Sequence, residues 1–303
     1  MSSRLDYKLL QALAAVVREQ SFERAAAAIF ITQSAISQRI KQLEQIISQP
    51  VLVRSTPPKA TEIGKQLISH YYQVEQLEQA LHEAIFPSAE HQLLTVHLAT
   101  NADSLATWLI PALKEVLTTH RVEFDLSVAD EKHTIEKLKG GEVFGAISME
   151  QQAIKGCQST YLGDLRYALV CSPEFQQQYF SNGVNPTSLA LAPAVAFDQR
   201  DDMHTQFVQA EFGLKRGDYP QHSVPSSDAF VALAKQGVAY CLVADIQIGK
   251  ELKSGQLVDL MPDFRLVRPL YWQRWQLLKG VHLAISNAIL ASRTRFLGQP
   301  AEL

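Results

Sequence analysis

The stretch "ERAAAAIFITQSAISQRIKQLE", from Glu23 to Glu44, places four consecutive alanines before a break and a second helical run. Alanine favours helix and lets two backbones approach closely, and Ser21 and Thr32 are residue types that cap helix N-termini. The stretch therefore predicts two short helices joined by a tight turn. The buried stripe of the second helix consists of Ile36, Ile40, Leu43 and Ile47.

The outward face of the second helix carries uncharged polar groups instead of mixed charges: Gln33, Ser34, Ser37 and Gln38. A helix-turn-helix lays such a face in the major groove of DNA, where amides contact base edges and short hydroxyls permit close approach. Arg39 and Lys41 suit phosphates. A helical hairpin inside a bundle is the alternative on this stretch alone.

The next segment, "QPVLVRSTPPKATEIG", predicts a short strand, a turn stiffened by Pro57 and Pro58, and a returning strand. Together they form a small wing with Arg54 and Lys59 near its tip. The predicted DNA-contacting residues are Ser21, Thr32, Gln33, Ser34, Ser37, Gln38, Arg39, Lys41, Arg54 and Lys59.

Thr61 is placed to cap a long helix whose apolar residues recur at spacings of four and three. This seam consists of Ile63, Leu67, His70, Val74, Leu77, Leu81 and Ala84. The flanking residues are strongly polar, so the apolar face is narrow and favours dimerisation. A helix lying on its own C-terminal body is the alternative.

The charge of the chain is divided unevenly over its 303 residues. Residues 1–65 hold nine Lys or Arg against five acids, whereas the remainder holds 19 basic and 26 acidic residues. A basic module on an acidic body is expected when only one part meets phosphate. The start lacks the apolar core of a signal peptide, which predicts a cytoplasmic protein. Cys157, Cys171 and Cys241 fit neither a disulfide framework nor a zinc site and are expected to be reduced core residues.

From Leu93 onwards, strand-like and helix-like segments alternate, which predicts an α/β body with largely parallel sheets. The predicted domains are a DNA-binding unit over 1–60, a linker helix over 61–90 and an effector domain over 91–303. The effector domain divides into subdomain I, 91–163 with 266–303, and subdomain II, 164–265. A small solute is expected in a cleft between them, at the carboxyl ends of strands.

The predicted effector-binding residues follow strands in this body: Asn101, Asp103, Ser104, Asp130, Ser148, Asp198, Ser227 and Asp228. Hydroxyls and free N–H groups at helix starts can hold a carboxylate, and the several Asp residues need a cationic partner. A zwitterion with a positive side chain, lysine or arginine, meets both demands. Asp and Ser are also common N-caps, so capping is the competing interpretation of Asp103, Asp130 and Asp228.

"FERAAAAIFITQSAISQRIKQLE" and "QPVLVRSTPPKATEIG" resemble the winged helix-turn-helix of LysR-type transcriptional regulators. Farther on, "NADSLATWLIPAL", "VAFDQRDDMH" and "RPLYWQRW" are similar to the ArgP (IciA)/LysG subgroup of that family, which controls basic amino acid export. The match covers nearly the whole chain in the family's order. The family often has Pro where this chain has Ser34 or Ala35, a departure that bears on base preference and not on the fold.

The resemblance implies a periplasmic-binding-protein-like effector domain and a homodimer or homotetramer on double-stranded DNA. It also implies an activator of amino acid transport or metabolism genes that works with RNA polymerase. The implied effector is lysine or arginine, with no cofactor and no metal, and Ser104 and Asp198 rank highest among its contacts.

Enzymatic motifs are missing from the sequence: there is no G-x-S-x-G, H-E-x-x-H, P-loop or G-x-G-x-x-G. We therefore expect no catalytic residues. An architectural DNA-binding protein acting at replication origins is the alternative function. A pure solute receptor is disfavoured, because it leaves the polar face of Gln33 to Gln38 without a purpose.

Overall fold

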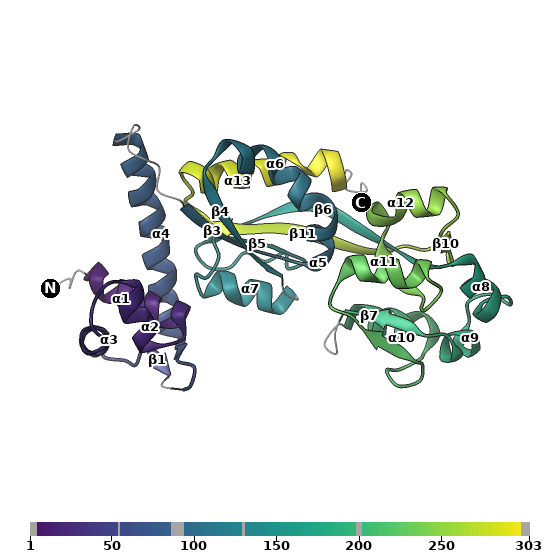
Figure 1. Ribbon diagram of the computed structural model, residues 1–303, viewed down its shortest axis with the longest axis horizontal. Helices are drawn as coiled ribbons and strands as arrows, with labels where there is room; N and C mark the ends of the chain where they lie inside the picture. The colour runs from purple at the N-terminus through teal and green to yellow at the C-terminus, as the bar shows by residue number, and fades with distance from the viewer. Residues whose placement is uncertain (1–4, 54, 86–93, 129–130, 198–201, 298–303) are drawn as a thin grey trace.

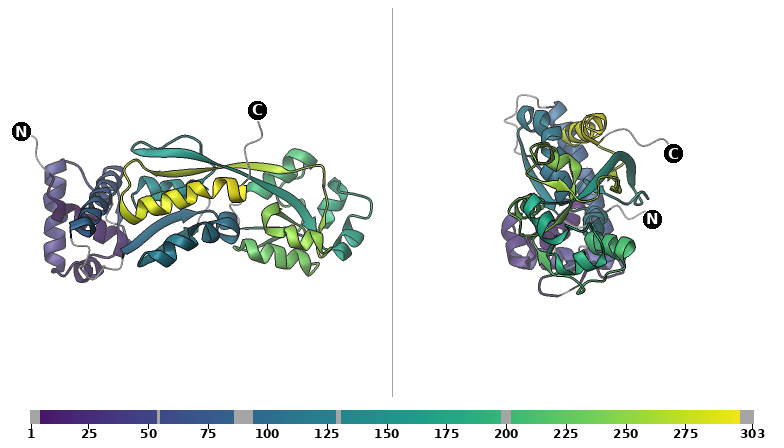
Figure 2. Two further views of the ribbon diagram at one scale, coloured as in Figure 1. Left: turned by 90° about the horizontal axis from the view of Figure 1, so that it is seen from above. Right: turned by 90° about the vertical axis from the view of Figure 1, so that its right-hand side faces the viewer.

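The computed structural model describes residues 5–53, 55–85, 94–128, 131–197 and 202–297. The molecule is elongated, with the N-terminal helices at one end and the segment from α8 to α12 at the other (Figures 1 and 2). The N-terminal elements are α1 (Tyr7–Glu19), α2 (Phe22–Ala28), α3 (Gln33–Ile47), β1 (Leu52–Val53), β2 (Lys59–Ala60) and the long α4 (Glu62–Ile85).

The C-terminal body alternates strands and helices from residue 94. Its first part holds β3 (Leu94–Thr100), α5 (Ala102–Ser104), a π-helical turn (Leu105–Leu109), α6 (Ile110–Thr119), β4 (Val122–Val128), α7 (Glu131–Lys139), β5 (Gly145–Ser148) and β6 (Cys157–Cys171). Then come α8 (Pro173–Tyr179), α9 (Pro186–Leu191), β7 (Ala194–Ala196), α10 (Asp202–Phe212), β8 (Gln221–Ser223), α11 (Ser227–Lys235), β9 (Cys241–Ala244), α12 (Asp245–Lys253) and β10 (Val258–Asp259). The chain returns through β11 (Leu266–Trp275), α13 (Gly280–Ala291) and a second π-helical turn (Arg293–Leu297).

The N-terminal helices begin where the sequence predicts them to begin. Ser21 accepts from the backbone N–H of Arg24 at α2, and Thr32 accepts from that of Ala35 at α3. The expected stripe of α3 is buried at Ile36, Ile40 and Leu43, against α1 and α2, while Ile47 lies partly buried at its edge. The wing is antiparallel, with Val53 opposite Lys59 and Leu52 opposite Ala60.

Helix α4 divides its predicted seam between two surroundings. Leu67 is 7% exposed and packs, with Ile63, into the core of the N-terminal helices, so these two residues serve the chain's own fold. Farther along, His70 is exposed and Leu81 is 60% exposed. The side chain of Ala84 is not among those described. A shorter apolar face than the predicted one therefore stays open on α4.

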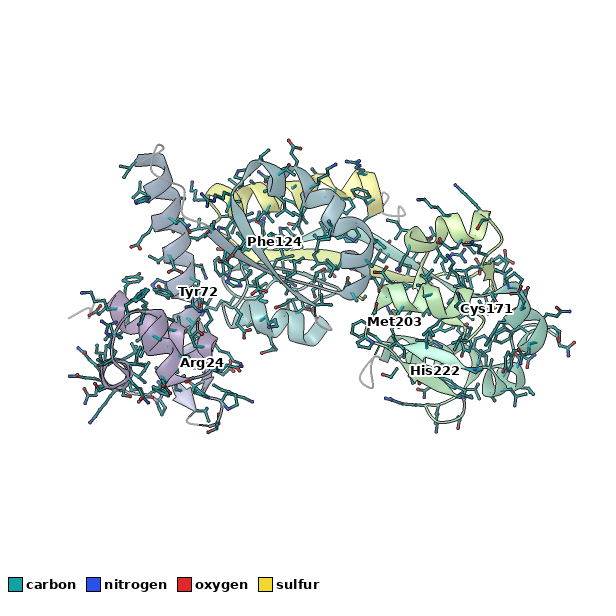
Figure 3. The ribbon with its side chains drawn as sticks, in the orientation of Figure 1. Arg24, Tyr72, Phe124, Cys171, Met203 and His222 are labelled. Carbon is teal, nitrogen blue, oxygen red and sulfur yellow. The ribbon has the colours of Figure 1, made fainter. Side chains whose placement is uncertain are left out.

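The opposite face of α4 lies on the C-terminal body. Tyr72, at this junction in Figure 3, packs against the cores of both parts. Gln76 is only 5% exposed, and its Nε2 donates to the backbone carbonyl of Leu277 at 2.6 Å. Gly141, at φ +72°, sits so close that an added Cβ would lie 2.4 Å from Cα of Ser69. The long helix thus both faces outward and docks on its own body.

The main sheet of the body is mixed, in contrast to the largely parallel sheets predicted from the alternation of strands and helices. Its order is β10-β6-β11-β5-β3-β4, and β9 also pairs with β6. The β3–β4 and β3–β5 pairs are parallel, whereas β6 and β11 run antiparallel to each other and to their other partners. The difference arises because β6 and β11 are long strands that cross between the two halves of the body.

We call the half built on β3, β4, β5, α6, α7 and α13 lobe I, and the half built on β7 to β10 with α8 to α12 lobe II. The largest buried cluster runs through both lobes, from Trp108 and Trp272 in lobe I to Phe207 and Tyr240 in lobe II. The three cysteines are buried free thiols, as expected, and burial raises the pKa of Cys171 to about 12.

Candidate nucleic-acid interface and ligand site

Helix α3 turns its polar residues to the outside. Gln33, Ser34, Ser37 and Gln38 are exposed, whereas Ile36 and Ile40, on the other side of the same turns, are buried. Within the helix none of these four side chains is needed to fill the core. Two amides and the Ser37 hydroxyl therefore face a partner that offers hydrogen-bonding edges, while the Ser34 hydroxyl also lies 3.0 Å from Thr32 Oγ1.

The cations predicted to contact phosphates have different surroundings. Lys41 and Lys59 are exposed, on α3 and on the wing strand β2. Arg39 is half-buried, and its Nη1 lies 3.5 Å from the backbone carbonyl of Lys8. Arg54 lies outside the described residues. Ser21 and Thr32 already accept from helix N–H groups, so their side chains act first as caps.

At the junction of the lobes, Asp103 joins groups from distant parts of the chain. Tyr167 Oη donates to Asp103 Oδ2 at 2.7 Å, and Ser227 Oγ donates to Asp103 Oδ1 at 2.7 Å. Asp103 stands at the carboxyl end of β3, Tyr167 on the crossing strand β6, and Ser227 at the start of α11 in lobe II. This carboxylate therefore holds both lobes together at one point.

Unused hydrogen-bonding groups lie beside this carboxylate. Asn101 Oδ1 caps the backbone N–H of Ser104 at 2.8 Å, while Asn101 Nδ2 and Ser104 Oγ are buried without a partner. Ser148 ends β5, the strand beside β3, and accepts from the N–H of Glu150 at 2.9 Å. The carboxyl ends of β3 and β5 lie side by side, and Asn101, Asp103, Ser104 and Ser148 stand at these ends.

Two further residues of this site were missed by the sequence analysis. Gln247, on α12, has its Oε1 3.0 Å from Ser227 Oγ, and its Nε2 donates to Asp228 Oδ1 at 3.0 Å. Tyr167 reads in the sequence as one more strand residue. Asp130 and Asp198, both predicted, lie outside the described residues. We refer to Asn101, Asp103, Ser104, Ser148, Tyr167, Ser227, Asp228 and Gln247 as the junction site.

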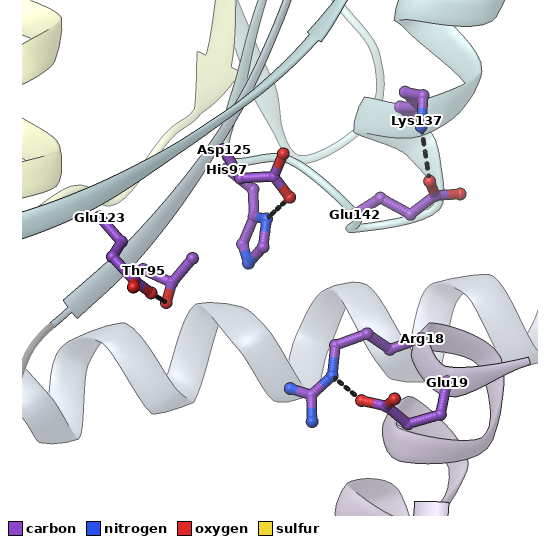
Figure 4. A network of polar contacts seen from close by, with 8 residues as sticks. All are labelled: Arg18, Glu19, Thr95, His97, Glu123, Asp125, Lys137 and Glu142. Atoms are coloured by element: carbon purple, nitrogen blue, oxygen red, sulfur yellow. Dashed lines mark hydrogen bonds and ion pairs between the residues drawn. The ribbon is translucent and has the colours of Figure 1, made fainter. Parts of the chain in front are cut away.

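A recess of about 1160 Å³ separates α1 and α4 from lobe I. Figure 4 shows charged side chains on both of its sides. On the helix side Arg18 pairs with Glu19 at 3.0 Å, and on lobe I His97 pairs with Asp125 at 2.9 Å and Lys137 with Glu142 at 3.1 Å. Each of these three pairs lies within one wall, whereas Lys65 of α4 lies 3.8 Å from Glu136 of α7 and so joins the two walls.

Among the described residues, no group of three or more His, Cys, Asp or Glu is arranged to hold a metal ion. His204, 2% exposed, is packed between Tyr219 and Tyr240, and burial lowers its pKa to about 4. A neutral imidazole buried in the core is a structural residue. The described helices include none that is long and apolar enough to span a bilayer.

Comparison with known proteins gives matches over nearly the whole chain. Residues 7–65 match the model of the bacterial regulatory helix-turn-helix protein, lysR family, and residues 90–274 match the LysR substrate binding domain. A curated relative, the HTH-type transcriptional regulator ArgP of Aeromonas salmonicida, is 51% identical over 293 residues, which cover 97% of this chain and 98% of the relative.

Two solved structures share the whole architecture. ArgP from Mycobacterium tuberculosis is 33% identical with a TM-score of 0.86, covering 98% of this chain and 100% of that one. Full-length LysG from Corynebacterium glutamicum with bound effector Arg is 29% identical with a TM-score of 0.81, covering 97% of this chain and 100% of the other.

Proposed function

Since the chain belongs to the LysR family of bacterial helix-turn-helix regulators, we propose that its junction site senses a basic amino acid and alters how the protein holds a promoter. The protein is a DNA-binding transcriptional regulator and not an enzyme. The genes we propose for it are those of amino acid export or metabolism. Its place of action would be the cytoplasm, where the DNA lies.

The chemistry of the junction site supports an amino acid with a cationic side chain. Asp103 and Asp228 supply two carboxylates for ammonium or guanidinium groups. Asn101 Nδ2 and Ser104 Oγ are donors without a partner, suited to the effector's carboxylate near the start of a helix. LysG, a structural relative, holds arginine. The single observation that carries the proposal is the bond from Ser227 to Asp103, which ties both lobes to one anionic group.

For the DNA contacts, we assign base readout to Gln33, Ser34, Ser37 and Gln38, which are exposed on one face of α3. Lys41, Lys59, Arg39 and Arg54 would contact phosphates. Two copies of α3 on one duplex require a dimer, and the face of α4 with His70, Val74, Leu77 and Leu81 is the surface we propose for it. Leu81 on this face is exposed, and Val74 and Leu77 are half-buried. Pairs of dimers and contact with RNA polymerase complete the proposed assembly.

The mechanism follows from the position of the parts. An effector bound at the junction site changes the orientation of lobe II relative to lobe I. Lobe I in turn contacts α4 through the hydrogen bond of Gln76 and the close packing at Gly141. A shift of α4 moves α3 in the groove and changes the bend of the DNA. The ligand acts only to the extent that it binds one arrangement better than the other.

Calorimetry on the full-length protein with each of the twenty amino acids tests the sensing role. Binding of lysine or arginine, and of no neutral amino acid at comparable affinity, is the expected result. Footprinting then separates two ways of using DNA. Protection confined to one promoter and altered by arginine supports the regulator, whereas protection spread evenly over A/T-rich DNA supports an architectural role at replication origins.

A further inference from the structure

We propose that Gln247 is a positioning residue of the junction site: it fixes Asp228 and offers the Ser227 hydroxyl a second acceptor, so that the effector's cation can take over Asp103. The inference rests on the proposed function, because it concerns how the effector enters that site. Gln247 itself acts through its neighbours.

The Ser227 hydroxyl has two acceptor oxygens within hydrogen-bond distance. Its Oγ lies 2.7 Å from Asp103 Oδ1 and 3.0 Å from Gln247 Oε1, and both neighbours are acceptors. A hydroxyl has a single hydrogen to donate, so it serves one acceptor at a time. The shorter contact, to an ionised carboxylate, is the stronger. Ser227 therefore donates to Asp103, and Gln247 Oε1 remains within reach as a second acceptor for the same hydroxyl.

The contact with Asp228 fixes which way the Gln247 amide points. Its Nε2 donates to Asp228 Oδ1 at 3.0 Å. Turning the amide over would place Oε1 against that carboxylate, acceptor against acceptor, and would lose the bond. Asp228 thus sets the amide so that Oε1 faces Ser227. In return, the amide restrains an aspartate that is exposed at the first turn of α11.

A cation that pairs with Asp103 changes the hydrogen-bond partner of the Ser227 hydroxyl. Where an ammonium or guanidinium group takes the lone pair of Oδ1 to which Ser227 donates, the hydroxyl loses that acceptor. Ser227 is 4% exposed, and water cannot easily accept the hydrogen bond that is freed. Without a second acceptor the buried hydroxyl would be left unsatisfied, which weakens binding by about tenfold to a hundredfold. Gln247 Oε1 removes that cost by accepting the hydrogen bond of the Ser227 hydroxyl.

The test is calorimetric titration of the full-length protein with arginine. Gln247→Met keeps the length of the side chain and removes the acceptor, and arginine should bind about 10 to 100 times more weakly. Gln236→Met, at the exposed far end of α11, is the matched control and should bind as the unmodified protein does. Should Gln247→Met fold poorly by thermal melting, Gln247→Ala replaces it with the same expectation.

A double-mutant cycle with Ser227→Ala distinguishes positioning from general damage. If Gln247 acts by accepting the hydrogen bond of the Ser227 hydroxyl, the loss of arginine affinity caused by Gln247→Met should be smaller, by about threefold or more, in the Ser227→Ala background. An equal loss in both backgrounds, or a loss below twofold in Gln247→Met alone, overturns the inference while leaving amino acid sensing intact. If the unmodified protein binds no basic amino acid, the proposed function itself fails, and this inference falls with it.

Discussion

Asp103 and Ser227, which are 124 residues apart in the sequence, share a hydrogen bond of 2.7 Å that joins lobe I to lobe II. Neither residue lies near the other in any local element: one follows β3 and the other begins α11. A buried hydroxyl against a carboxylate is a short, charge-assisted bond, and it sits where a cationic side chain would compete for the same oxygen.

Asp103→Asn should weaken arginine binding by about 10 to 100 times, because a charged partner contributes about 1.5–3 kcal/mol to a hydrogen bond. DNA affinity measured without arginine should change little. Titration calorimetry and gel shifts on the same preparation check both expectations. Asp125→Asn is the control, since Asp125 lies on the neighbouring strand β4 and pairs with His97 away from the junction site.

Gln38→Ala should relax base discrimination at one position of the binding site. A bidentate amide contact discriminates by about 1–3 kcal/mol, and its loss should leave the salt dependence unchanged. Binding to a panel of single-base operator variants measures this. Gln45→Ala, an exposed amide near the other end of α3, should leave the preferences as they were. If Gln38→Ala discriminates between bases as well as Gln45→Ala does, Gln38 does not contact a base edge in the groove.

Lys59→Ala should weaken binding to all DNA sequences alike and lower the slope of log affinity against log salt by about one. The reason is that a wing lysine on β2 neutralises a phosphate, whatever the base beside it. Affinities at several salt concentrations, on specific and unrelated duplexes, give the slope. Lys253→Ala, on the distant helix α12, should not change it.

Gly141→Ala should separate effector binding from its effect on DNA. A Cβ there would lie 2.4 Å from Cα of Ser69, so α4 must move away from lobe I. Overpacking typically costs about 1–3 kcal/mol of unfolding free energy. Arginine should still bind, while its effect on DNA affinity should shrink. Gly183→Ala is the control for backbone strain alone, because Gly183 also has a positive φ, +83°, but nothing lies within 4 Å of its added Cβ.

His204 should make the protein sensitive to mild acid. Burial lowers its pKa to about 4, whereas the unfolded chain titrates near the ordinary value of 6.5. Between these values the unfolded state binds a proton that the folded state excludes, so the free energy of unfolding falls as pH falls, by up to about 3 kcal/mol. Above pH 6.5 this effect vanishes.

Urea unfolding of His204→Gln at pH 7, 5.5 and 4.5 checks the assignment, and the expected result is a flatter acid limb. Some slope should remain, because burial also lowers the pKa of His282 to about 4. The exposed His222 provides the comparison, and His222→Gln should follow the unmodified protein. An acid limb that is equally steep in His204→Gln would assign the sensitivity to other groups.

The N-terminal half could be predicted closely because its signals are local. Ser21 and Thr32 cap the helices they precede, and a spacing of four and three residues identifies the buried side of α3. The same local pattern predicted the apolar seam of α4. It did not predict that Ile63 and Leu67 would pack against the N-terminal helices and leave the rest of the seam outside that core. A periodic stripe shows that a face is apolar and does not show what covers it.

The candidate ligand site was predictable only where strand ends carry it. Asn101, Asp103 and Ser104 follow β3 directly, and the carboxyl ends of neighbouring parallel strands meet. Tyr167 lies inside the long strand β6 and Gln247 in the first turn of α12, and only the crossing of β6 and the packing of α12 bring them to Asp103 and Ser227. The mixed order of the sheet escaped prediction for a related reason, since strand length alone does not reveal that β6 and β11 span both lobes.

The recess between α4 and lobe I has a consequence for how such a protein can change over generations. Arg18 pairs with Glu19 on one wall, and His97 and Lys137 pair with Asp125 and Glu142 on the other, while Lys65 of α4 and Glu136 of α7 pair across from wall to wall at 3.8 Å. Because the junction site shares no residue with the lining of this recess, its chemical preference can change while the contacts of α4 with lobe I stay as they are. A junction site that binds a different ligand could then act on the same promoter, as long as the hydrogen bond from Gln76 to Leu277 and the close packing at Gly141 are kept.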